Sequence, residues 1–122
     1  MSATAIAAAL QRVQSVFQRR PEAGLHEDAP ALSRWTGGMR VVTQHADGHA
    51  VNTDMPLELG GSGDQVTPGW LMRAGLASCT ATRIAMAAAT EGTVLDLLEV
   101  GAGSRSDARG LLGMSEVDGR PV

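Results

Sequence analysis

The apolar segment at residues 68–91 constrains the fold of this chain more than any other stretch. It follows Thr67, a favourable N-cap residue, and it precedes Gly92, a typical residue just past a helix end. Its first residue is a proline, which is well tolerated at the first helical position. Between residues 74 and 90 the only charged residue is Arg83. A helix that is apolar nearly all round is buried on all sides, so we predict a long, buried central helix.

The length of the chain limits what can cover such a helix. The chain has 122 residues, enough for one modest domain, and aromatic residues make up only 2% of it. A core of this size is built mainly from aliphatic and methionine side chains and buries a limited fraction of the surface. The simplest cover for the central helix is a second copy of the chain. We therefore predict a homodimer with this helix near its centre.

A second helix is predicted over residues 3–19, because apolar residues recur there at three- and four-residue spacing. These residues are Ile6, Leu10, Val13 and Phe17. Pro21 ends this pattern. A membrane-surface helix would need a strongly basic polar face, so packing on the domain or on a partner is favoured. Accordingly, we assign residues 1–20 to an N-terminal helix, 21–31 to a linker and 32–122 to a single core domain.

Extended segments flank the central helix. Residues 32–44 (LSRWTGGMRVVTQ) and 49–59 (HAVNTDMPLEL) predict a bent antiparallel hairpin, with a tight Asp-Gly turn at Asp47. Residues 94–103 and 110–118 predict further strands, with SRSDARG as their connecting turn.

Charge and composition exclude several classes of function. The formal net charge is −3, and the basic residues are scattered arginines rather than a basic stripe, which argues against nucleic-acid binding. No signal peptide is visible, and Arg73 and Arg83 make residues 68–90 a poor membrane span. The single cysteine cannot form an internal disulfide. We expect a soluble, cytoplasmic protein that needs no cofactor.

The role of the single cysteine, Cys79, has two possible interpretations. Free cysteine is often a small buried filler, but Arg83 follows one turn later and could favour a reactive thiolate. The histidines support neither a metal site nor a cysteine–histidine hydrolase strongly. His45 and His49 flank a turn without a third ligand nearby, and His26 lies in the linker.

Four ordered motifs resemble the OsmC/Ohr family, thiol-dependent proteins that include organic hydroperoxide reductases. The motifs are WTGG (35–38), DMPLELGGSG (54–63), TPGWLMRAGLASCTA (67–81) and DARGLLG (107–113). Together they span most of residues 33–118, and they are closer to the OsmC-like branch of the family than to its dedicated hydroperoxide reductases. The resemblance implies an α+β, OsmC-like fold in which a long central helix packs against strongly bent sheets. It also implies an intertwined homodimer with active sites at the subunit interface.

The resemblance also implies roles for individual residues. Cys79 matches the peroxidatic cysteine of the family, and Arg40 lies within a residue of the arginine that holds the thiolate. The activating glutamate of the family falls at Gly69 in this sequence, and no second cysteine is present to resolve the sulfenic acid. The family's C-terminal segment also has no counterpart here, so the core looks C-terminally short.

The sequence therefore predicts thiol-dependent reduction of organic hydroperoxides in oxidative stress defence. Cys79 is the expected nucleophile, Arg40 or Arg83 its electrostatic partner, and an external thiol the reductant. The alternative is a non-enzymatic dimeric module that binds a small apolar ligand at the subunit interface. The latter predicts ligand binding that does not depend on the thiol.

Overall fold

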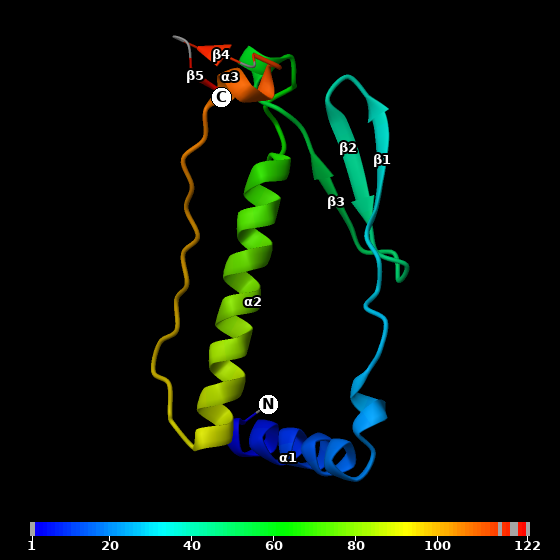
Figure 1. Ribbon diagram of the computed structural model, residues 1–122, viewed down its shortest axis with the longest axis vertical. Helices are drawn as coiled ribbons and strands as arrows, with labels where there is room; N and C mark the ends of the chain where they lie inside the picture. The colour runs from blue at the N-terminus through cyan, green and yellow to red at the C-terminus, as the bar shows by residue number, and fades with distance from the viewer. Residues whose placement is uncertain (1, 115, 118–119, 122) are drawn as a thin grey trace.

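The computed structural model describes residues 2–114, 116–117 and 120–121. A long helix stands between a small sheet on one side and an extended C-terminal segment on the other, and the N-terminal helix crosses its lower end (Figure 1). In chain order the elements are α1 (Ala3–Arg19), a 3-10 turn (Pro21–Gly24), β1 (Leu32–Gly37), β2 (Arg40–Gln44), β3 (Ala50–Thr53), a second 3-10 turn (Leu57–Leu59), α2 (Pro68–Glu91), α3 (Ala108–Leu111), β4 (Glu116–Val117) and β5 (Arg120–Pro121). Helices and antiparallel sheet together confirm the α+β class.

Helix α2 has the predicted bounds because both of its ends carry the expected caps. The Thr67 hydroxyl accepts a hydrogen bond from the Trp70 N–H at 3.2 Å, and Pro68 occupies the first helical position. At the other end Gly92 adopts a left-handed φ of 72°, and its N–H donates to carbonyls of the last turn. These contacts satisfy backbone groups that a helix end otherwise leaves without partners.

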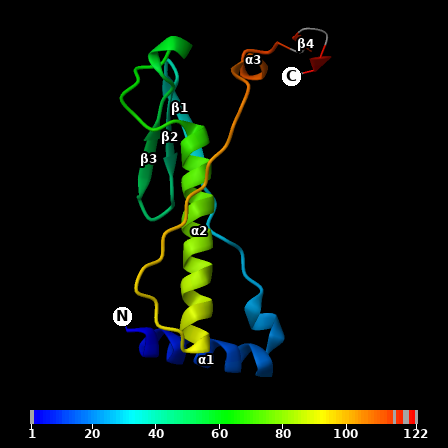
Figure 2. The same ribbon diagram turned by 90° about the vertical axis from the view of Figure 1, so that its left-hand side faces the viewer.

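Helix α1 also has the predicted bounds. The Ser2 hydroxyl accepts a hydrogen bond from the Ala5 N–H at 3.1 Å and caps the first turn. The chain then turns at Pro21, where the predicted linker begins with one 3-10 turn. Figure 2 shows α1 crossing the C-terminal end of α2, where Ile6 and Ala88 line the same small cavity.

The predicted hairpin contains one more reversal than the sequence indicated, because residues 32–44 form two strands rather than one. Gly37 and Gly38 have φ values of 127° and 59°, conformations that glycine adopts without a steric cost, and they reverse the chain between β1 and β2. The Trp35 indole N–H donates to the Gly38 carbonyl across this turn at 2.9 Å. The predicted turn at Asp47 then joins β2 to β3, giving an antiparallel sheet in the order β1-β2-β3.

The register of the sheet separates its two faces. One face is turned toward α2, since several of its residues line a cavity together with Leu71 of that helix. By register this inner face comprises Ser33, Trp35, Val41, Thr43, Val51 and Thr53. The opposite face carries the alternating neighbours of these residues.

Strand β3 ends at Thr53, so the prediction of extended structure as far as residue 59 is wrong. The chain leaves the sheet at Asp54 and folds back on itself. The Gly61 N–H donates to the Pro56 carbonyl at 3.0 Å, and the Gly63 N–H donates to the Met55 carbonyl at 3.2 Å. A compact loop therefore connects the sheet to α2.

The strand predicted at residues 94–103 does not pair with any described part of the chain. Residues 94–106 run extended beside α2 (Figures 1 and 2), and their one side-chain link to the helix is the Arg73 guanidinium, which donates to the Ser104 hydroxyl at 3.0 Å. The side chains of Leu98, Val100 and Ala102 are half-buried, while their alternate neighbours are exposed. This alternation is typical of a strand, but the segment has no ladder.

The second predicted strand, at residues 110–118, begins inside a helical turn, because α3 ends at Leu111. The Asp107 carboxylate accepts a hydrogen bond from the Arg109 N–H at 3.0 Å and caps α3, so SRSDARG leads into helix rather than into a tight turn. Only Glu116–Val117 forms a strand in this range, and residues 115 and 118 lie outside the described part.

Helix α2 is mostly exposed in the single chain, so its predicted burial depends on a second copy of the chain. Ala88 and Ala89 are the only residues of this helix that are buried, whereas Met72 and Leu76 are 72% and 63% exposed. The sheet lies beside the first turns of α2 and α1 crosses its last turns, which leaves the middle uncovered by these elements (Figure 1). Among the described residues, no helix is both long and apolar enough to cross a membrane.

Candidate functional site

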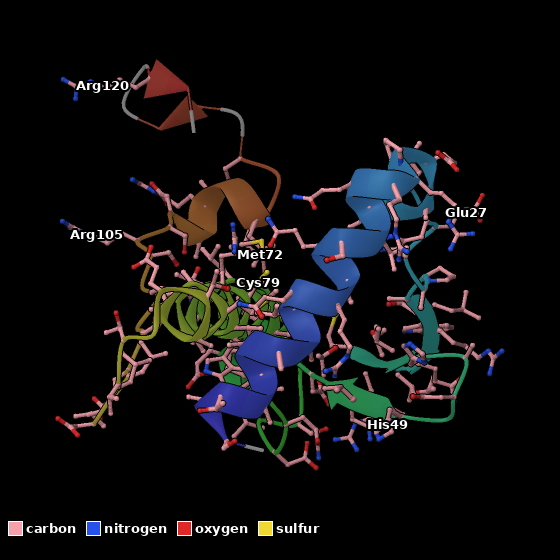
Figure 3. The ribbon with its side chains drawn as sticks, turned by 90° about the horizontal axis from the view of Figure 1, so that it is seen from below. Glu27, His49, Met72, Cys79, Arg105 and Arg120 are labelled. Atoms are coloured by element: carbon pink, nitrogen blue, oxygen red, sulfur yellow. The ribbon has the colours of Figure 1, made fainter. Side chains whose placement is uncertain are left out.

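Cys79 lies in the uncovered middle of α2, and its thiol is free and exposed. Figure 3 shows Cys79 and Met72 projecting from the same side of the helix, as residues seven apart do. The thiol is exposed because nothing among the described residues covers this face in one chain, and the predicted burial of Cys79 at a dimer interface stays a prediction. An accessible thiol meets the first requirement of a reactive cysteine.

Arg83 follows Cys79 by one helical turn and is also exposed. Side chains four residues apart on a helix are neighbours, with Cβ atoms about 5–6 Å apart. Within the described residues, Arg83 forms no ion pair, in contrast to Arg40 and Arg109. No carboxylate in the described part of the chain therefore compensates its charge, and its position on α2 is one helical turn from that of Cys79.

Arg40, the other predicted partner of the thiol, is engaged elsewhere. It begins β2, and its Nε donates to the Asp54 carboxylate at 3.2 Å while its Nη2 pairs with Asp64. These two ion pairs are its side-chain contacts among the described residues. Within one chain, Arg83 lies one helical turn from Cys79, whereas Arg40 is held by two aspartates.

The aspartate cluster around Arg40 was not predicted from the sequence. Asp54 is only 2% exposed, and its carboxylate also accepts a hydrogen bond from the Met55 N–H at 2.8 Å. Gly61 passes so close to this point that an added Cβ would lie 1.8 Å from the Met55 carbonyl oxygen. The cluster ties the start of β2 to the loop that leads into α2.

Hydrogen bonding lowers the pKa of both carboxyl groups of this cluster. Burial raises the pKa of Asp54, but hydrogen bonds from Met55, Arg40 and Ser62 outweigh it, so that the net shift is downward. The pKa of Asp64 is lowered chiefly by its hydrogen bond with Arg40. The same two bonds raise the pKa of Arg40, which is charged in any case.

These shifts predict that the fold loses stability in acid. A carboxyl group whose pKa is lowered on folding stabilises the folded state at any pH above its ordinary pKa of 3.8. This stabilisation is lost as the pH falls through the lower pKa of the folded state. The urea midpoint is therefore expected to be lower at pH 3 than at pH 6. In Asp64→Asn the difference between these two pH values should be smaller, whereas Asp96→Asn, which alters an exposed carboxylate, should behave like the wild type. An unchanged pH dependence in Asp64→Asn would contradict this role.

Gly69 stands in the first turn of α2, where the family pattern has a glutamate. A Cβ at this position would lie 3.4 Å from Nη1 of Arg73, one turn later. The long arginine side chain can give way by a few tenths of an ångström. An arginine side chain therefore lies close to this position.

Gly69→Glu is therefore expected to stabilise the protein by about 1–2 kcal/mol. The change removes a helical glycine, adds an acid near the helix N-terminus and creates a pair with Arg73 at i,i+4. Gly69→Ala isolates the backbone contribution, which is about 0.5–1 kcal/mol. Thermal unfolding of the three proteins measures both increments. Equal melting temperatures for the Ala and Glu variants would show that the charge contributes nothing.

The three histidines are distant in sequence from Cys79 and Arg83. His45 and His49 flank Asp47 in the β2–β3 turn, with Nδ1 atoms 3.0 and 2.9 Å from its Oδ1. His26 pairs with Asp28 in the segment before β1. In the part of the chain that the structure describes, no group of three His, Cys, Asp or Glu side chains could hold a metal ion.

Comparison with known proteins adds no family to this description. No protein-family model matches the chain, and none of the curated proteins matches it. The candidate site is therefore defined by its own residues: Cys79 and Arg83 on the open face of α2, with Gly69 and Arg73 nearer the start of the helix.

Proposed function

We propose that this protein is a thiol-dependent peroxidase that reduces organic hydroperoxides in oxidative stress defence, working as a homodimer with Cys79 as nucleophile. The observation that carries the proposal is the exposed thiol of Cys79, with Arg83 one helical turn away and in no ion pair among the described residues. The resemblance of the sequence motifs to the OsmC/Ohr family supports the same position and chemistry. Arg83 is our first choice as the cation that stabilises the thiolate, because Arg40 is held by two aspartates.

The first chemical step is attack of the Cys79 thiolate on the hydroperoxide oxygen farther from carbon. An S–O bond forms and the O–O bond breaks. The alkoxide leaves and takes up a proton to become the alcohol, and the cysteine becomes a sulfenic acid. Sulfur is oxidised by two electrons, and the peroxide is reduced by two.

An external thiol completes the cycle, because the chain has only one cysteine. The first thiol attacks the sulfenic sulfur, forms a mixed disulfide with Cys79 and releases water. A second thiol attacks the mixed disulfide, regenerates the Cys79 thiol and leaves as a disulfide. Each turnover therefore consumes two thiols and one hydroperoxide.

The homodimer is supported by two strand edges without partners in the described chain. Residues 94–103 are extended but unpaired, and β1 pairs only with β2, so its outer edge is open. These edges lie on opposite sides of α2 (Figure 1), which separates them within one chain. In a two-fold dimer, residues 94–103 of each copy would add to β1 of the other, so that both edges are paired.

A non-enzymatic dimeric module that binds a small apolar ligand is the second candidate function. Exposed apolar side chains favour it, since Met72 and Leu76 on α2 continue the surface that includes Cys79. Large exposed apolar patches mark binding sites. This module would not need a reactive thiol.

The test of the proposed function is exposure of the protein to tert-butyl hydroperoxide, followed by intact mass and turnover measurements. We expect the wild type to gain one oxygen atom at Cys79 and to consume the hydroperoxide with dithiothreitol as reductant. Cys79→Ser should do neither. Arg83→Met should slow consumption by about tenfold through loss of the cation, while Arg12→Met, on α1, should match the wild type. Consumption that is unchanged in Cys79→Ser would contradict peroxidase activity and favour the binding module.

A further inference from the structure

The outer edge of β1 is an apolar strand edge that no described part of the chain covers. Strand β1 pairs only with β2, and Leu32 and Trp35 on it are exposed. An exposed apolar edge of this kind is a template for pairing with another strand. Residues 94–103, which are extended but have no ladder, offer a second open edge on the other side of α2 (Figure 1). Because α2 stands between these edges in one chain, a second copy is the occupant that fits both.

Burial indicates how the two edges face each other in such a pairing. Leu98 and Val100 are half-buried and therefore lie on the side of the segment toward α2, whereas Glu99 between them is exposed. In a continuous sheet the half-buried residues belong on the same side as Ser33 and Trp35, the inner-face residues of β1. The opposite choice would place the Glu99 carboxylate on the inner face of the sheet, where burial of an unpaired charge is costly.

One charged residue on each edge then determines the register. Arg34 lies on the outer face of the sheet, where its partner on β2 is Val42. The segment presents Leu97, Glu99 and Gly101 on the same face, and Glu99 is the one that carries a charge. Neither Arg34 nor Glu99 forms an ion pair among the described residues. Opposite charges directly across a strand pair are favourable and like charges are not, so Arg34 belongs opposite Glu99.

The levels of the two edges along α2 determine the direction of pairing. Ser33 lines a depression together with Pro68, so β1 lies beside the first turns of α2. Ser104 bonds to Arg73 near the same end, and Glu99, five residues earlier, lies about 16 Å farther along the helix at about 3.3 Å per residue. A two-fold axis along α2 would keep the two levels apart, whereas an axis across α2 brings them together. Both edges run toward the N-terminal end of α2 in one chain (Figure 1), so an axis across α2 makes the pairing antiparallel.

We propose that β1 of each copy pairs antiparallel with residues 94–103 of the other copy, with Arg34 directly opposite Glu99. This inference rests on the homodimer of the proposed function and deepens it by specifying its register and direction. In the same register Ser33 meets Val100 on the inner face. Each three-stranded sheet thereby gains a fourth strand from the other copy.

The position of the two-fold axis brings the Cys79 site into this interface. At 1.5 Å per residue of helix, Glu99 lies level with a point about 11 residues beyond Arg73, near Ile84. An axis midway between this level and the first turn of α2 passes near Leu76 and Cys79. The second copy therefore covers the part of α2 that carries the thiol, and the site is complete only in the dimer.

Charge reversal tests the register by sedimentation over a range of concentrations, with every variant also carrying Cys79→Ser. Arg34→Glu and Glu99→Arg should each raise the dimer dissociation constant by about tenfold, because each places like charges opposite each other twice per dimer. Loss of one charge alone should have little effect, since an exposed ion pair contributes little. An equimolar mixture of the two reversed variants should associate like the Cys79→Ser parent, because both pairs in the mixed dimer have opposite charges. Arg12→Glu makes the same change of charge on α1 and should also match this parent.

Cross-linking through introduced cysteines tests the direction of pairing in the same Cys79→Ser background. Ser33→Cys with Val100→Cys places two thiols directly opposite each other in the antiparallel register, with Cβ atoms about 4.5–5.5 Å apart, and should give a disulfide-linked dimer on oxidation. Ser33→Cys with Leu98→Cys places them opposite each other only in a parallel pairing and should cross-link much less. Helix content by circular dichroism checks that each variant is folded.

The outcomes separate this inference from the peroxidase activity. All variants lack the Cys79 thiol, so the result does not depend on whether the wild type consumes hydroperoxide. Equal dissociation constants for the reversed variants, their mixture and the parent would overturn the register. Preferential cross-linking of the Leu98→Cys variant would overturn the direction. A parent that stays monomeric at all concentrations would overturn both this inference and the proposed homodimer.

Discussion

Replacing Gly61 with alanine is expected to destabilise the protein by about 3 kcal/mol or more, as overpacking against backbone does when the backbone cannot move aside. The new Cβ would lie 1.8 Å from the carbonyl oxygen of Met55 and 2.7 Å from Oδ1 of Asp54. Neither atom belongs to a flexible side-chain end that can swing away, because Asp54 is held by Arg40. Relief therefore requires the loop to open and the buried carboxylate to lose its partners.

Urea unfolding of Gly61→Ala beside a matched glycine variant measures this effect. A Cβ at Gly101 would meet no atom within 4 Å, so Gly101→Ala should change the unfolding free energy by less than about 0.5 kcal/mol. Near-equal stabilities of the two variants would mean that the loop adapts easily and does not hold a fixed conformation.

A proline at position 99 is expected to raise the dimer dissociation constant by about 100-fold. Proline removes a backbone N–H and is not tolerated inside a paired strand. One lost ladder hydrogen bond costs about 1.5 kcal/mol, and a two-fold dimer contains two such strands, so the total is about 3 kcal/mol. In the single chain, Glu99 lies in an extended segment without a ladder, so the same change should leave the folded monomer intact. The effect would therefore fall on association and not on helix content.

Sedimentation analysis of Glu99→Pro and Glu99→Ala over a range of concentrations tests this expectation. The alanine variant removes the same side chain but keeps the N–H, so it should associate like the wild type. If both variants dimerise equally well, residues 94–103 do not pair across the interface, and the proposed mode of association is wrong.

The helices could be predicted from the sequence because local chemistry determines where they begin and end. Thr67 and Gly92 cap α2 without any help from distant residues, and the Asp47 turn is likewise local. The reversal at Gly37 and Gly38 is also marked locally, by two adjacent glycines, although the sequence analysis predicts one continuous extended segment there. Its prediction required weighing turn chemistry above the run of apolar residues around it.

The remaining differences come from contacts between parts of the chain that are distant in sequence. The ion pair of Arg40 with Asp64 joins residues separated by a whole strand and a loop, and no local pattern marks it. Burial of α2 was inferred from its composition, but exposure depends on what surrounds a helix. One chain does not supply that cover. For the same reason the sequence located Cys79 on α2 correctly, while its surroundings depend on the predicted second copy.

The loop between Asp54 and Thr67 holds the N-terminal end of α2, so a small tilt at this end produces a larger displacement further along the helix. Cys79 stands about 17 Å along the helix from its first residue, at a rise of 1.5 Å per residue. A tilt of about 10° at that end would carry the thiol sideways by about 3 Å, roughly the length of a hydrogen bond. The close backbone contact at Gly61 and the buried Asp54 carboxylate therefore influence the position of the Cys79 sulfur, although neither of them contacts it.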